Sequence, residues 1–345
     1  MLGIDWRKTA IALAAGFGGA LVGVYAGVPA GSLLGSTFAV TVAALIGLRP
    51  TVPPFLRDFG FCVIAVSLGS GVTPNILSEL ARWPMSLAML AVAMLSVIFI
   101  CGWILQRLFG AEAPAALLAT SPGALSYTLA LADDRGADVR FVMVLQSLRL
   151  LLITLLLPPL IGYAEGGAGV APQGDAPHIG YGAGAILLAA TFVLGTLITR
   201  LRVPAPIVMA GLVLSGIAHG AGFVSGRLAD PVTFVGFTVI GAVIGTRFAG
   251  ISRAELKRLG MAGVASTSVA VSISVAFAWI VSLLLSLPFG QVWVSFAPGG
   301  VEGMSSMALA LGYDPLYVAV HHVFRILLLI LILPVLIRFA GKRII

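Results

Sequence analysis

Two Pro-Gly stretches and two arginines are the residues of this chain whose types and spacing could do chemistry. Ser121-Pro122-Gly123 is followed by Arg149, and Pro298-Gly299-Gly300 is followed by Arg325, with the prolines and the arginines each 176 positions apart. Each arginine lies inside an apolar run. A guanidinium group there can bind an anion through its planar fork of N–H donors, or it can cap backbone carbonyls as a fixed positive charge.

The Pro-Gly stretches predict breaks in two apolar helices. Proline removes a backbone donor and clashes with the preceding turn, and adjacent glycines let the chain leave helical geometry. Unwound backbone at membrane depth is tolerated only where it is buried in protein or lines a polar cavity. Freed carbonyls can hold a cation there, and a helix N-terminus can hold an anion. The alternative is a proline kink inside a helix that crosses the membrane fully.

One acidic residue lies well inside an apolar stretch. Glu302 follows the second break directly, which predicts a role in binding Na⁺ or H⁺. The alternatives are an ion pair with Arg325 or a contact with a free backbone N–H. Ser126 occupies the equivalent position after the first break, so the two copies are not chemically the same.

The predicted substrate- and ion-binding residues surround the two breaks. Hydroxyl groups after each break can line a cavity or satisfy helix backbone, and the adjacent histidines can relay protons or serve as polar packing. No catalytic, metal-ligating or cofactor-binding residue is predicted, apart from a site for a coupling Na⁺ or H⁺. The set comprises Ser121, Pro122, Gly123, Ser126, Tyr127, Gln146, Arg149, Pro298, Gly299, Gly300, Glu302, Ser305, Ser306, His321, His322 and Arg325.

The composition predicts an all-α polytopic membrane protein. Hydrophobic residues make up 59% of the 345 residues and the mean hydropathy is +1.10. The net charge of +7 comes from cations at segment ends, which is typical of topology signals rather than of a nucleic-acid partner. The apolar stretches are 9–28, 31–48, 59–77, 84–105, 113–132, 139–162, 182–201, 205–221, 231–249, 260–287, 291–312 and 315–340.

Internal duplication organises these stretches. Glycines, an acid and two prolines recur 176 positions apart, a pattern typical of transporters built from structural repeats. The predicted domains are a first membrane repeat at 1–162, an extracytoplasmic linker at 163–181 and a second membrane repeat at 182–345. Asp138 and Asp314, at equivalent positions, are predicted to cap the helices that follow them.

The distribution of positive charge predicts two repeats of inverted topology. Suppose that one segment in each half does not cross the membrane. Among the lysines and arginines between the segments, only Arg82 and Arg227 then lie on the external side, and the others lie in the cytoplasm. The preferred incomplete segments are 113–132 and 291–312, with broken or re-entrant helices at the Pro-Gly motifs. The shorter segments at 31–48 and 205–221 are the alternative, because the number of crossings in each half is the same if these are the segments that do not cross. Both termini are then cytoplasmic.

The chain resembles the duplicated AbrB-type family of bacterial inner-membrane proteins. More loosely it is similar to the bile-acid/sodium symporter and cation–proton antiporter group. The resemblance implies a panel domain, a core domain with crossed broken helices, and elevator-like or rocking secondary transport. The core lacks an adjacent acidic pair, which favours a solute carrier over a dedicated antiporter. The motifs that carry it are Leu34-Gly35, Gly60 with Gly69, Ser121-Pro122-Gly123, Ala297 to Glu302, and the last segments ending at Pro158 and Pro334.

The expected function is secondary active transport of a small anionic organic metabolite, coupled to Na⁺ or H⁺. The protein is expected not to be an enzyme, and its expected partners are the substrate and the lipid bilayer, with a homodimer as the oligomer to test. Members of the family are often labelled ammonia monooxygenase or regulator. The alternatives are therefore an intramembrane enzyme or a membrane component that affects gene expression indirectly.

Overall fold

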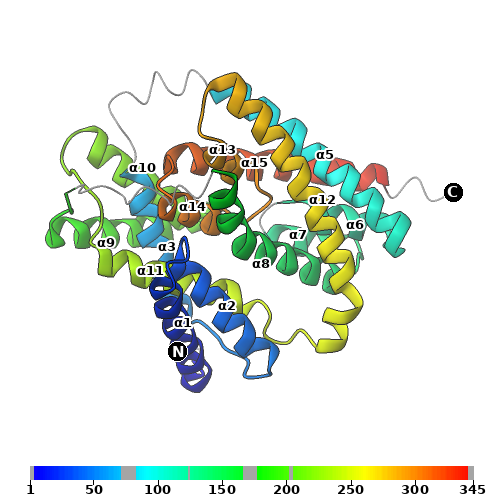
Figure 1. The fold of residues 1–345 in the computed structure, drawn as a ribbon, viewed down its shortest axis with the longest axis horizontal. Helices are drawn as coiled ribbons and strands as arrows, with labels where there is room; N and C mark the ends of the chain where they lie inside the picture. Colours follow the sequence, from blue (N-terminus) through cyan, green and yellow to red (C-terminus); the bar gives the residue numbers. More distant parts are fainter. Residues whose placement is uncertain (1–3, 71–82, 123–124, 166–176, 202–204, 341–345) are drawn as a thin grey trace. The chain divides into compact units, whose positions relative to one another are not determined.

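The computed structural model describes residues 4–70, 83–122, 125–165, 177–201 and 205–340 (Figure 1). In these residues the chain forms fourteen α-helices and one short 3₁₀ helix, which confirms the all-α prediction. The helices are α1 Trp6–Tyr25, α2 Gly31–Leu45, α3 Pro54–Gly69, α5 Trp83–Phe109, α6 Ala113–Thr120, α7 Leu125–Asp134, α8 Val139–Ala164, α9 Tyr181–Ile198, η1 Thr199–Leu201, α10 Pro206–Gly220, α11 Asp230–Thr246, α12 Arg253–Leu285, α13 Phe289–Phe296, α14 Val301–Ala310 and α15 Pro315–Ala340.

Helix length and apolarity define a multi-pass membrane protein. Within the described ranges, six helices are long and apolar enough to cross a membrane, namely α1, α5, α8, α9, α12 and α15. The helices α2, α10 and α11 are apolar but have only 15 to 17 residues. At 1.5 Å per residue they fall short of the roughly 30 Å hydrocarbon core.

Both predicted breaks are present. The segment 113–132 consists of α6 and α7, and the segment 291–312 consists of α13 and α14. Two separate helices replace the kinked continuous helix that was the alternative, because Pro122 and Pro298 lie in the non-helical connections. The helices α6 and α13 begin at residues 113 and 289, which preserves the offset of 176 positions. The inverted orientation of the halves stays a prediction.

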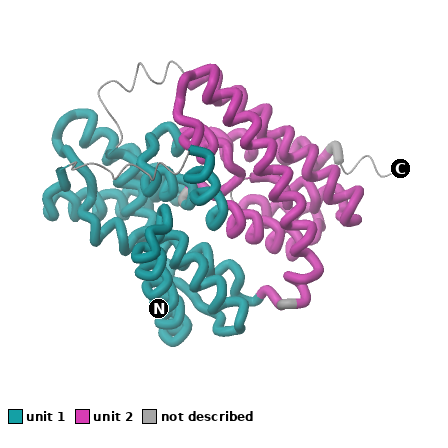
Figure 2. Tube along the Cα trace, viewed as in Figure 1, with its two compact units in different colours: residues 1–81, 154–250, 302–319 teal, residues 82–153, 251–301, 320–345 magenta. Residues whose placement is uncertain are grey.

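The chain divides into two compact units (Figure 2). Unit 1 consists of residues 1–81, 154–250 and 302–319, and unit 2 of residues 82–153, 251–301 and 320–345. Unit 1 therefore holds the first three helices of each predicted repeat, and unit 2 holds α5, α6, α7, α12 and α13. Equivalent helices of the two repeats thus belong to the same unit, with one exception: α7 lies in unit 2, whereas α14 lies in unit 1 from residue 302 on.

In unit 1 the helices α1 and α2 pack with almost no space between their backbones. A Cβ atom on Gly19 would lie 2.2 Å from the Gly35 carbonyl oxygen, and one on Gly23 would lie 2.3 Å from the Gly31 carbonyl oxygen. Small residues permit this approach, as is common between membrane helices. The same unit packs α2 against α11 and α10 against α3.

We expect Gly19→Ala to destabilise unit 1 by about 1–3 kcal/mol, since the added methyl group would collide with backbone that cannot move aside. The adjacent variant Gly18→Ala is the matched control, because nothing lies within 4 Å of a Cβ atom at that position. Thermal unfolding of the purified protein in detergent should show a lower midpoint for Gly19→Ala only. Equal midpoints for the two variants would contradict the packing of α1 on α2.

In unit 2 the helix α5 packs along α12 and against α6, and α13 packs against α12. The buried Cys101 thiol on α5 donates to the Ser266 carbonyl on α12 at 3.4 Å. Both Cys62 and Cys101 are free and buried. A buried free cysteine packs as a small apolar side chain.

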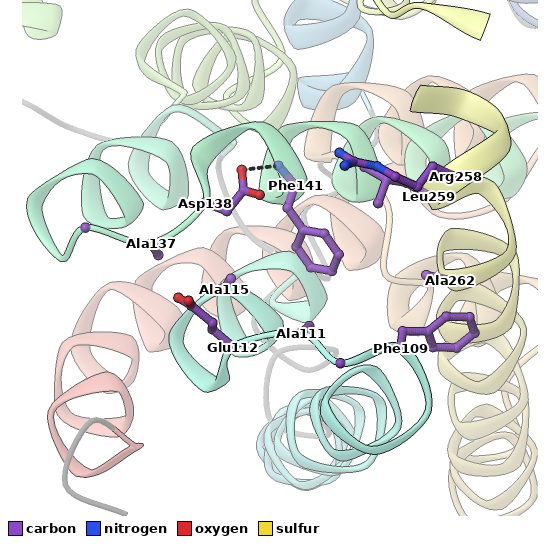
Figure 3. A pocket seen from close by; sticks show the side chains of 12 residues that line it. Phe109, Ala111, Glu112, Ala115, Ala137, Asp138, Phe141, Arg258, Leu259 and Ala262 are labelled. Carbon is purple, nitrogen blue, oxygen red and sulfur yellow. Dashed lines mark hydrogen bonds between the residues drawn. The ribbon is translucent and has the colours of Figure 1, made fainter. Parts of the chain in front are cut away.

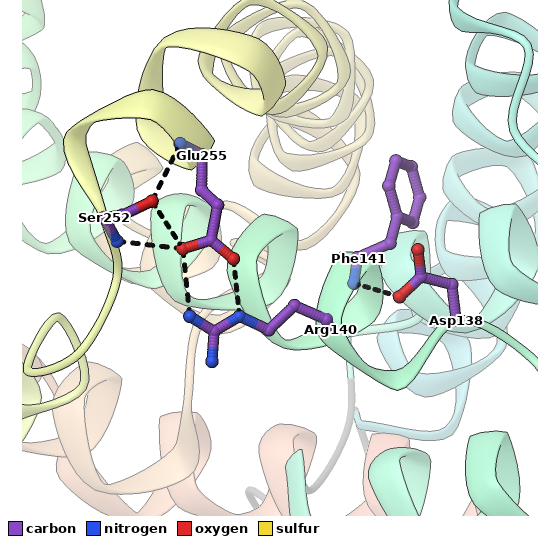
Figure 4. Close-up of polar contacts among 5 residues, drawn as sticks. All are labelled: Asp138, Arg140, Phe141, Ser252 and Glu255. Atoms are coloured by element: carbon purple, nitrogen blue, oxygen red, sulfur yellow. Dashed lines mark hydrogen bonds and ion pairs between the residues drawn. The ribbon is translucent and has the colours of Figure 1, made fainter.

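Two predicted helix caps are confirmed. The Asp138 carboxylate accepts the backbone N–H of Phe141 at 2.9 Å (Figure 4), and the Asp314 carboxylate accepts that of Leu316 at 2.9 Å. Close to the first cap, Arg140 binds both oxygens of Glu255 at 2.7 and 2.9 Å (Figure 4). This exposed pair joins the beginning of α8 to the beginning of α12.

Candidate functional site: two broken helices capped by buried arginines

The breaks leave two helix ends inside unit 2. The carbonyls of the last turn of a helix have no partner within the helix, and they carry its negative dipole end. After α6 the backbone is extended at Ser121, and after α13 it is extended at Ala297. These carbonyls therefore need donors from elsewhere, and a cation is the preferred donor.

Arg149, on α8, supplies donors to the end of α6. Its Nη1 donates to the Ala119 carbonyl at 3.1 Å, and its Nη2 donates to the Ser121 carbonyl at 3.3 Å. The residue is 4% exposed, and its Nε has no hydrogen-bond partner in the described part of the chain. No carboxylate of the described residues lies within ion-pair distance of this guanidinium.

Arg325, on α15, makes the corresponding contacts with the end of α13. Its Nη1 donates to the Ala297 carbonyl at 2.7 Å, and its Nη2 donates to the Gly299 carbonyl. The residue is 2% exposed. Ser121 and Ala297 are equivalent positions, so both guanidinium groups hold the same carbonyl of their repeat. These contacts agree with the capping interpretation of the two arginines.

One turn before each arginine, a second donor binds the same helix end. Gln146 Nε2 donates to the Leu118 carbonyl at 2.8 Å, and His322 Nε2 contacts the Val294 carbonyl at 3.1 Å. Both donors and both carbonyls are 176 positions apart. Gln146 Nε2 also lies 2.9 Å from the Thr128 hydroxyl oxygen on α7.

His321 has a different environment from its neighbour. Its Nε2 lies 2.6 Å from the Ser86 hydroxyl oxygen on α5. The rings of Trp83 and Phe296 lie near its imidazole, with centroids 6.3 and 6.2 Å away. Of the two interpretations of the adjacent histidines, polar packing describes the surroundings of His321 well.

The structure brings most of the predicted site residues into unit 2. The Tyr127 hydroxyl on α7 donates to the Ile330 carbonyl on α15 at 3.1 Å. The buried Ser305 and Ser306 lie on α14 and belong to unit 1. Gly123 and the side chains of Ser126 and Glu302 lie outside the described residues.

A pocket of about 520 Å³ lies at the beginning of α6, still within unit 2 (Figure 3). Its charged lining residues are Glu112, Asp138 and Arg258, and its apolar walls include Phe109 and Phe141. The sequence did not indicate this pocket, because its lining comes from the ends of separate helices. Asp138 was expected to act only as a helix cap.

These features define a class: a multi-pass helical membrane protein in which two equivalent helices are interrupted and capped by buried arginines. The chain belongs to the AbrB family. The family described as "Transition state regulatory protein AbrB" matches residues 32–341.

Two curated proteins are similar to most of this chain. It is 24% identical to "Uncharacterized protein YhjN" of Bacillus subtilis (strain 168) over 291 residues, which cover 80% of this chain and 76% of that protein. It is 25% identical to "Putative regulator AbrB" of Escherichia coli (strain K12) over 285 residues, which cover 81% of this chain and 80% of that protein.

Proposed function

We propose that this protein is a secondary active transporter. It moves a small anionic organic metabolite across the bacterial inner membrane, and a Na⁺ or H⁺ gradient drives the movement. The supporting observation is the pair of buried guanidinium groups, each anchored to the end of an interrupted membrane helix. Interrupted helices in repeated halves are how many secondary transporters build a central binding site.

The charge of Arg149 supports an anionic substrate. A buried cation is costly unless a countercharge or hydrogen bonds compensate it. Arg149 obtains two carbonyl contacts in the described residues, and its Nε–H remains without a partner. A carboxylate or phosphate oxygen can accept that donor and offset the charge. The carbonyl contacts meanwhile hold the guanidinium in one orientation, which favours recognition.

The division into units supports alternating access. We interpret unit 1 as the panel and unit 2 as the core, because unit 2 holds both capped helix ends. The core then moves the substrate past the panel in an elevator-like or rocking step. On this proposal the protein is not an enzyme and needs no cofactor, and its partners are the substrate, the lipid bilayer and, as the oligomer to test, a second copy. Glu302 remains a second residue to test for the coupling ion.

A thermal-shift screen tests the preference for anions. Succinate, citrate, pyruvate and glycerol phosphate should be compared with uncharged amide or alcohol analogues, since a ligand stabilises the folded state that it binds. At about a hundredfold excess over its dissociation constant, a bound ligand adds about 2.7 kcal/mol of stability. Stabilisation by anions alone is expected. Stabilisation by the neutral analogues to the same degree would contradict an anion site.

Cysteine labelling tests the proposed orientation in the inner membrane. Arg135 and Tyr163 are exposed and lie near opposite ends of α8, whose 26 residues span about 39 Å. In intact cells an impermeant maleimide should label Tyr163→Cys, while Arg135→Cys should react only after the membrane is opened. The native cysteines are buried and give a low background. Labelling of both positions from outside would contradict a cytoplasmic start of α8.

A further inference from the structure

Gln146 and His322 bind equivalent carbonyls, and each keeps a second polar atom that has no hydrogen-bond partner among the described residues. These atoms are Gln146 Oε1 and His322 Nδ1. Both side chains are 0% exposed. A buried acceptor without a donor costs about 1–3 kcal/mol, so its presence at both equivalent positions points to something that binds there.

Hydrogen-bond geometry fixes the tautomer of His322. The Val294 carbonyl can only accept, so the Nε2 atom that contacts it at 3.1 Å must carry the hydrogen. In the neutral imidazole, Nδ1 then holds an unprotonated lone pair. The Gln146 amide has the same arrangement, with its N–H bound to the Leu118 carbonyl and its oxygen left as an acceptor.

The two residues differ in one chemical property. Both donate one hydrogen and present one acceptor, but only imidazole can take up a proton near neutral pH. The repeat therefore contains a titratable group in its second copy at a place where the first copy has a neutral amide. A single site of this kind predicts one proton for each transport cycle.

The groups that surround His322 set the conditions for protonation. Among the described residues, the charged or titratable groups that act on it are Arg325 and His321, both on α15. The helix α13, which supplies the Val294 carbonyl, contains no titratable residue, and α7 reaches α15 through Tyr127 two turns further along. A second positive charge beside the Arg325 guanidinium is unfavourable, and a bound anion reduces that cost.

We propose that the coupling ion is a proton and that His322 Nδ1 binds it. A proton from one compartment forms an N–H bond at Nδ1, and the Nε2–H contact with the Val294 carbonyl is kept. The anionic substrate offsets the added charge, so proton and anion bind together. The same N–H bond breaks when the proton leaves to the other compartment, and nothing is oxidised or reduced. This inference rests on the proposed transport function and names its coupling ion.

The chain itself supplies the test variant. His322→Gln places the residue of the first repeat in the second, and it keeps the donor to the Val294 carbonyl while removing the proton site. With one proton per monovalent anion, a gradient of one pH unit supports about tenfold accumulation. Vesicles with the wild-type protein should accumulate labelled pyruvate about tenfold, whereas His322→Gln should only equilibrate it. The exposed His178→Gln is the matched control and should behave as the wild type.

The protonation state of His322 can be measured directly, and this measurement tests the proposal before the substrate is identified. Nitrogen NMR of ¹⁵N-histidine protein in lipid should show an Nε2–H tautomer signal, assigned to His322 by comparison with His322→Gln, that converts to imidazolium on acidification in the presence of pyruvate, succinate and citrate. That signal should be missing in His322→Gln. If His322 stays neutral throughout, or if His322→Gln still accumulates anions in a pH gradient, the proton site is wrong. Accumulation driven by Na⁺ alone would contradict proton coupling but would agree with the proposed transport function. The anion screen tests that function separately.

Discussion

Arg149→Leu should lose thermal stability and anion binding together. The variant leaves the carbonyls of Ala119 and Ser121 at the end of α6 without the donors that now reach them at 3.1 and 3.3 Å. A hydrogen bond from a charged donor contributes about 1.5–3 kcal/mol, so losing it destabilises the fold. A domain is stable by only about 5–15 kcal/mol, so the loss is a large fraction of its stability.

Two companion variants separate charge from geometry. Arg149→Lys keeps the charge but lacks the planar fork that reaches two carbonyls, so we expect an intermediate midpoint and weaker anion stabilisation. Arg140→Leu removes the exposed bond to Glu255 and should leave the unfolding midpoint nearly unchanged, because an exposed ion pair contributes little. Thermal unfolding with and without the anion panel measures all three. An Arg149→Leu protein as stable as Arg140→Leu would contradict the capping role.

The triple variant Pro298→Ala, Gly299→Ala and Gly300→Ala should abolish transport while raising helix content. Replacing proline favours a helix by about 3 kcal/mol, and each glycine by about 1 kcal/mol. A continuous helix would then run from the beginning of α13 to the end of α14. The carbonyls that Arg325 and His322 now contact would be used inside that helix. The guanidinium would remain buried without those acceptors, at a cost of about 1.5–3 kcal/mol for each lost bond.

Circular dichroism and anion binding measure the two sides of this prediction. The matched control is Gly260→Ala on α12, where a Cβ atom meets nothing within 4 Å and helix propensity changes without a break nearby. The control should bind anions as the wild type does. A triple variant that binds and moves anions normally would show that the interruption is not part of the site.

Local sequence was sufficient to predict the helices and their interruptions. Apolar runs indicate membrane helices, and a proline followed by glycine favours the end of a helix. Proline alone does not, because Pro158 and Pro334 lie inside the continuous helices α8 and α15. The caps at Asp138 and Asp314 were predicted for the same reason, since the carboxylate and the N–H groups that it accepts lie within three residues. The repeat of 176 positions also showed that Gln146 and His322 occupy equivalent positions.

Contacts between segments that are distant in the sequence could not be predicted from local sequence. Arg149 contacts the carbonyls of residues 119 and 121, whereas Arg325 contacts those of 297 and 299, a register that differs by two positions from the repeat. Backbone carbonyls have no sequence signature, so the partners of both arginines became visible only in the fold. The same holds for the close approach of Gly19 to Gly35 and for the pocket beside Glu112.

Uptake of labelled organic anions into vesicles tests the central claim most directly. Purified wild-type protein should be reconstituted beside the triple variant, and pyruvate, succinate and citrate should be offered under imposed pH and Na⁺ gradients of both directions. The account predicts saturable accumulation of at least one of these anions by the wild type, and none by the triple variant or by empty vesicles. A folded wild-type protein that moves no anion under any of these gradients would contradict it.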